Sequence, residues 1–96
     1  MNNNTVKLQF DKAVTRLAGY EFGVKTYEDQ INGKINFNEL PITIEFPEQI
    51  VRVASSFAQG FFKALTEKFG YNLIGKEIIL KSENQSLIDS IINNLL

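Results

Sequence analysis

The chain contains neither cysteine nor histidine among its 96 residues. It therefore has no disulfide, no thiol nucleophile, no imidazole acid or base, and none of the usual nitrogen or sulfur ligands of zinc. Tryptophan is also absent, and the sequence holds only two prolines and one methionine. No catalytic set can be recognised in what remains, so we expect no enzyme activity, no cofactor and no metal.

The chain has no marked excess of positive or negative charge, because its formal net charge is only -1, and its lysines and arginines are scattered singly. No stretch could neutralise several phosphates, which disfavours nucleic-acid binding. Residues 1–5 lack the basic-then-apolar pattern of a signal peptide, and no apolar run approaches the roughly 20 residues that span a bilayer. We expect a cytoplasmic protein that does not enter the membrane.

The sequence does contain enough apolar residues for a packed core: 44% are hydrophobic, and eight are phenylalanine. A chain of this length has room for one core only. We therefore expect a single domain over residues 1–96, with residues 1–4, including the asparagine run, disordered.

Three segments have the character of β-strands. Thr5 to Phe10 alternates apolar and polar residues, as a strand covered on one face does. Pro41 to Phe46 alternates in the same way and is stopped by Pro47, which cannot donate to a ladder. Glu77 to Lys81 is short and apolar, which predicts burial on both faces.

Helical patterns separate and follow these strands. We predict a short helix from about Gly23 to Ile31, with a loop or turn over the ambiguous stretch from Asp11 to Tyr20. A longer helix opens at Ser55 and Ser56 and ends at Gly70. Its apolar stripe consists of Phe57, Phe61, Leu65 and Phe69.

Ser82 and Gln85 have the spacing of a capping box at the start of a last helix. The broad stripe of that helix indicates burial against the sheet, although its last residues could instead form a partner or homodimer surface. The stripe consists of Leu87, Ile88, Ile91, Ile92, Leu95 and Leu96.

Strands that alternate with helices predict an α/β fold. We expect a two-layer sandwich, with about three helices on a small, mainly parallel or mixed sheet of three or four strands.

Several of these segments together resemble a known family. The strand Ile42 to Phe46 leads through Val51 to Val53 into Ala54 to Phe62, where a serine pair and a phenylalanine open the helix. This layout resembles the bacterial STAS-like family, related to the sulfate transporter and anti-sigma factor antagonist domains. Arg16 and Gly23 stand where that family tends to carry these residues, and the strand and helix of residues 77–96 also fit.

The resemblance implies a regulatory module that docks on a protein partner, such as a histidine-kinase-like ATPase or a sigma regulator. In the antagonists such a kinase phosphorylates a serine at the start of this helix, which here would be Ser55 or Ser56. The antagonists carry aspartate before the serine pair and glycine after it, whereas this chain has Ala54 and Phe57. Docking tolerates that departure better than phosphoregulation does.

The partner-binding surface implied by the resemblance surrounds the beginning of this helix. It consists of Glu48, Arg52, Ser55, Ser56 and Gln59. A purely structural interpretation of the two serines is that they cap the helix. A second function also remains open, namely a phage or mobile-element inhibitor of a host enzyme, since such proteins need no site of their own. A small hydrolase has little support without histidine or cysteine.

Overall fold

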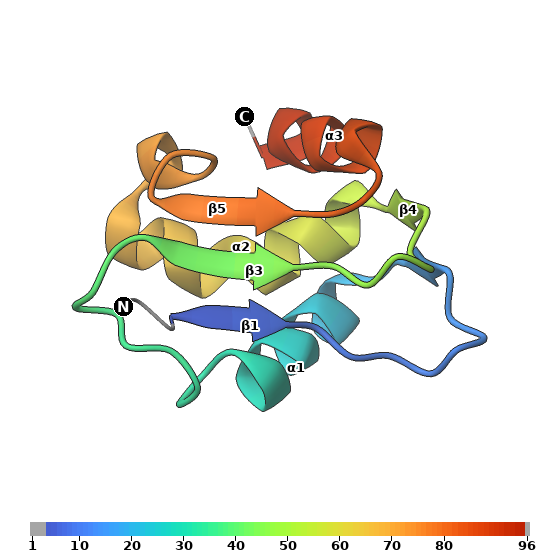
Figure 1. Cartoon of the computed structure of the whole chain (residues 1–96), viewed down its shortest axis with the longest axis horizontal. Coiled ribbons are helices and arrows are strands. Elements are labelled where there is room, and N and C mark those ends of the chain that lie inside the picture. Colours follow the sequence, from blue (N-terminus) through green and yellow to red (C-terminus); the bar gives the residue numbers. More distant parts are fainter. Residues whose placement is uncertain (1–3, 96) are drawn as a thin grey trace.

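A computed structural model describes residues 4–95 (Figure 1). The elements in chain order are β1 (Thr5–Lys7), β2 (Arg16–Leu17), α1 (Tyr20–Gln30), β3 (Ile42–Glu45), β4 (Arg52–Val53), α2 (Ser55–Phe69), the 3-10 helix η1 (Tyr71–Leu73), β5 (Ile78–Lys81) and α3 (Gln85–Leu95).

The three predicted strands form one parallel sheet in the order β1-β3-β5. Val6 pairs with Ile44, and Ile44 pairs with Leu80, so side chains of the same register lie in one row across the sheet. The two-residue strands β2 and β4 form a second parallel pair that the sequence did not predict. The expected α/β class, helix count and mainly parallel sheet are confirmed, with the strands divided between two small sheets.

Figure 1 shows α1 and α2 behind the three-stranded sheet, as the second layer, while α3 lies beyond β5 and contacts α2, β4 and β5. The buried side of the sheet carries Ile42 and Ile44 of the central strand and Phe46 directly after it, as the alternation predicts. The opposite side carries polar residues. One row across it consists of Lys7, Glu45 and Lys81.

That polar side explains why burial of β5 on both faces is wrong. Ile78 and Leu80 are buried, but Ile79 is half-buried and Lys81 is exposed. The strand lies at the edge of the sheet, and no helix covers its outer face, so it alternates like the other two.

The two helices of the second layer approach each other more closely than ordinary side chains allow. A Cβ atom on Gly23 of α1 would overlap the carbonyl oxygen of Phe57, and would lie 2.7 Å from the Phe61 nitrogen. A Cβ atom on Gly60 of α2 would overlap the carbonyl oxygen of Tyr20. The two helices therefore pack backbone to backbone at these glycines. Helix α1 begins at Tyr20, three residues before the predicted start at Gly23.

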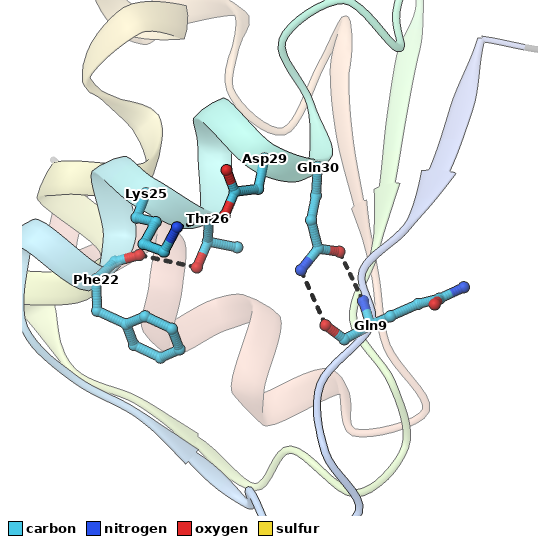
Figure 2. Close-up of polar contacts among 6 residues, drawn as sticks. All are labelled: Gln9, Phe22, Lys25, Thr26, Asp29 and Gln30. Carbon is cyan, nitrogen blue, oxygen red and sulfur yellow. Dashed lines mark hydrogen bonds and ion pairs between the residues drawn. The ribbon is translucent and has the colours of Figure 1, made fainter.

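Side-chain amides fasten the N-terminal segment to the rest of the fold. The Gln30 side chain accepts from the Gln9 N–H at 2.8 Å and donates to the Gln9 carbonyl at 2.9 Å, which ties the end of α1 to the chain after β1 (Figure 2). Asn4 donates to the Asn36 carbonyl at 2.7 Å and accepts from the Asn36 N–H at 2.9 Å. Asn4, the last residue of the segment expected to be disordered, is buried, while residues 1–3 lie outside the described residues.

The C-terminal stripe packs inward. Leu87, Ile88 and Ile91 are buried, and Leu95 packs against the core, while Leu96 lies outside the described residues. Between residues 4 and 95, the structure contains no helix with both the length and the apolar character needed to cross a bilayer.

Candidate functional site

The beginning of α2 is held in place by the small β2–β4 sheet. Val51 donates its N–H to the Thr15 carbonyl at 2.8 Å, and Ala54 donates to the Leu17 carbonyl at 2.8 Å. Leu17 and Val53 face each other across the pair and are both buried. The helix therefore starts from a fixed point on the protein rather than from a free loop.

The outward-facing residues of the same pair are two arginines. Arg16 is the register partner of Arg52, and both are exposed. Like charges directly opposite each other on neighbouring strands repel, so this pairing slightly opposes folding. The result is a positive surface immediately before α2, next to Val51, an apolar side chain that is 56% exposed.

Neither serine caps α2 as the sequence predicted. The helix begins at Ser55, its N-cap position is Ala54, and no side chain makes a capping hydrogen bond there. The Ser56 hydroxyl instead accepts a hydrogen bond from the Gly19 N–H at 3.0 Å. This hydrogen bond links the beginning of α2 to the beginning of α1. The Ser56 hydroxyl thus accepts from a backbone N–H distant in the sequence rather than from one in the first turn of α2.

The two serines consequently have different surroundings. Ser56 is half-buried and engaged with Gly19, whereas Ser55 is exposed. Ser55 also lines a depression of about 450 Å³ between β4, the start of α2 and one side of α3. The depression is lined by Val51, Arg52, Val53, Ala54, Ser55, Asn84, Ser86, Leu87, Ser90 and Asn94.

The structure brings together only part of the predicted surface. Arg52 and Ser55 line the depression, while Gln59 lies one turn along α2 in a neighbouring hollow that also includes Asn94. Glu48 is exposed in the turn after β3 and lines neither hollow. Ser56 points to Gly19 rather than into the depression.

Sequence reasoning missed the contribution of α3. Ser86, Ser90 and Asn94 are spaced by four residues, so they share one face of the helix. That polar stripe is visible in the sequence beside the apolar one. Its position opposite Arg52 is not, because it depends on how α3 returns to the β2–β4 pair.

The groups in the depression are hydroxyls, amides and one guanidinium. They can donate and accept hydrogen bonds and attract a carboxylate or phosphate at Arg52. Within the described part of the chain, no three acidic side chains gather in a way that could hold a metal ion. The geometry supports recognition of a polar, negatively charged surface.

The comparisons with known proteins add nothing to this geometry. No family model, no curated protein and no solved structure matches the chain.

Proposed function

We propose that the chain is a non-catalytic regulatory module of the STAS-like type, which binds a protein partner through the beginning of α2. The observation that carries the proposal is the convergence of Arg52 and Ser55 with the polar stripe of α3 in one depression. The path from β3 through β4 into α2 supports it, because this is the segment on which the resemblance rests.

The exposed arginine pair favours an acidic partner surface. Arg16 and Arg52 lie side by side, and a carboxylate between them would relieve their repulsion. Exposed Val51 adds an apolar contact beside the two charges. A partner such as a histidine-kinase-like ATPase or a sigma regulator would therefore present acidic residues around a small apolar site.

The phosphorylation site in this proposal is Ser55 rather than Ser56. Ser55 is exposed and makes no capping hydrogen bond, whereas the Ser56 hydroxyl already accepts from Gly19. A phosphate on Ser55 would lie at the positive end of α2 and close to Arg52, where the chain itself can accommodate it. The same charge would repel an acidic partner and release it.

The first test is an affinity pull-down with the full chain from its native host, followed by measured affinities for the partner that is identified. We expect an ATPase or sigma regulator that binds the wild-type chain, and at least tenfold weaker binding by Ser55→Asp and Arg52→Glu. Raised salt should weaken the wild-type complex, because exposed charges are screened.

Two variants serve as matched controls outside the depression. Asn72→Asp adds a negative charge at an exposed position of η1, and Lys34→Glu makes the same charge reversal as Arg52→Glu in an exposed turn. Both should bind like the wild type. Equal binding by Ser55→Asp and Asn72→Asp would rule out this docking surface, and recovery of a nuclease or other defence enzyme would favour the inhibitor function.

A further inference from the structure

A second, larger hollow lies between α1 and α2, separate from the depression at the beginning of α2. Its volume is about 1130 Å³. We call it the α1–α2 groove. It is lined on α1 and the residues after it by Tyr20, Glu21, Phe22, Val24, Lys25, Tyr27, Glu28, Asp29 and Asn32, and on α2 by Gly60, Lys63, Ala64 and Glu67.

The groove combines exposed aromatic side chains with negative charge. The Tyr20 side chain is 43% exposed, and Val24 and Tyr27 in the same lining are half-buried. Four carboxylates face two ammonium groups along the lining. One of those ammonium groups, on Lys25, is already paired with Asp29 at 2.9 Å. Figure 2 draws both side chains on α1.

The backbone around the groove restricts what can fill it. The groove is walled by two helices, whose backbone groups are bonded within each helix. It therefore has no sheet edge to which an extended segment could add. An α-helix satisfies its own backbone groups, so it can bind such a groove through its side chains alone.

We propose that the α1–α2 groove binds an amphipathic helix of a partner protein, whose apolar side chains meet Tyr20 and Val24 and whose lysines or arginines meet Glu21, Glu28 and Glu67. A second copy of this chain does not fit, because α3 has no basic residue, α1 has only Lys25, and each basic residue of α2 is near Glu67. A nucleic acid or anionic membrane would be repelled by the same carboxylates.

The proposal is independent of the docking surface at the beginning of α2, and an NMR titration separates the two. The labelled full chain is titrated with two synthetic helical peptides of identical leucine positions, whose polar positions are all lysine in one and all glutamate in the other. We expect amide shifts in residues 20–32 and 60–67 with the lysine peptide, and at least tenfold weaker binding of the glutamate peptide.

Charge reversal in the chain completes the test. Glu28→Lys with Glu67→Lys should weaken binding of the lysine peptide at least tenfold and strengthen binding of the glutamate peptide. The control pair, Glu77→Lys with Glu83→Lys, changes the net charge equally at exposed positions outside the groove and should leave the lysine peptide's affinity unchanged.

Three outcomes would overturn the proposal: no binding of the lysine peptide at millimolar concentration, shifts centred on Ser55 and Arg52, or equal losses in the two double variants. None of these results depends on whether the pull-down finds a partner at the beginning of α2. The two surfaces can therefore succeed or fail separately.

Discussion

At the level of single residues, the neighbouring serines Ser55 and Ser56 have different roles. Ser56 accepts the Gly19 N–H, which would otherwise lack a partner at the start of α1, and Ser55 faces outward. A half-buried donor that loses its acceptor destabilises a fold by about 1–3 kcal/mol. The Ser55 hydroxyl, which is exposed and makes no capping hydrogen bond, contributes little to the stability of the fold.

We therefore predict that Ser56→Ala lowers the free energy of unfolding by about 1 kcal/mol, because the Gly19 N–H loses its acceptor. Ser55→Ala should change it by less than about 0.5 kcal/mol, since the side chain is exposed. Urea unfolding at constant temperature measures both. Equal losses in the two variants would mean that the Ser56 hydroxyl does not hold Gly19.

At the scale of the elements, the close approach of α1 and α2 determines the second layer. Gly23 and Gly60 each face backbone atoms of the other helix, so neither position has room for a Cβ atom. Across the crossing, Phe22 of α1 packs edge to face on Phe57 of α2, with 5.4 Å between the ring centroids. The shape of the α1–α2 groove depends on this short distance between the helices.

Gly60→Ala tests the close approach of the two helices, because helix propensity and steric overlap predict opposite changes in the free energy of unfolding. Helix propensity alone predicts that alanine stabilises an interior helical position by about 1 kcal/mol relative to glycine. The overlap with the Tyr20 carbonyl oxygen predicts the opposite, a loss of about 2–3 kcal/mol. Thermal and urea unfolding of Gly60→Ala, with Gln59→Ala as the exposed neighbour, would decide between the two.

The elements also show what the sequence can reveal. The strands and the long helix were predictable, because alternation in β3 and the four-residue spacing from Phe57 to Phe69 are local patterns. The pair β2–β4 was not, since two-residue strands have no period. In the sequence, Gly23 indicated the start of α1. In the structure it lies inside the helix, where the backbone of Phe57 on α2 leaves no room for a Cβ atom, and that contact is not visible in the sequence.

The predicted helix caps were also wrong, because the hydroxyls and amides concerned bond to other groups than the local pattern suggests. Gln85 donates to Asp89 at 3.2 Å, and the Ser82 hydroxyl accepts the Asn84 N–H at 3.0 Å, so α3 begins without the expected capping box. Half of the candidate site was predictable, because Arg52 and Ser55 follow a recognisable strand. The α3 side of the depression depends on tertiary packing and could not be predicted.

At the scale of the whole molecule, the absence of histidine and cysteine shapes the response to pH. No side chain has its usual pKa between pH 6 and pH 9, so stability should vary little there. Above that range, burial raises the pKa of the Tyr27 phenol over its usual 10.0. The hydrogen bond to Asp29 raises the pKa of the exposed Lys25 ammonium over 10.5.

Both shifts act in the same direction. A raised pKa means that the folded chain holds the proton more tightly than the unfolded chain, so the stabilisation is complete below pH 10.0 and is lost as the pH rises through the folded-state pKa. We predict that the wild type's urea midpoint falls as the pH rises above about 10, and that Tyr27→Phe removes part of the fall.

Tyr71→Phe is the matched control for this experiment, because the Tyr71 side chain is 53% exposed. It should lose stability with pH as the wild type does. Parallel curves for Tyr27→Phe and the wild type would show that the Tyr27 phenol does not titrate with folding.

The bond between Gln30 and Gln9 has a consequence for how copies of this chain behave at high concentration. The Leu8 N–H donates to Glu45 in β3, so the Gln9 N–H points to the outer edge of the sheet, where an unpaired strand can template aggregation. The Gln30 amide occupies both polar groups of Gln9 at that edge. A strand arriving from another copy would have to displace this side chain, so the Gln30 amide hinders edge-to-edge pairing between copies at Gln9.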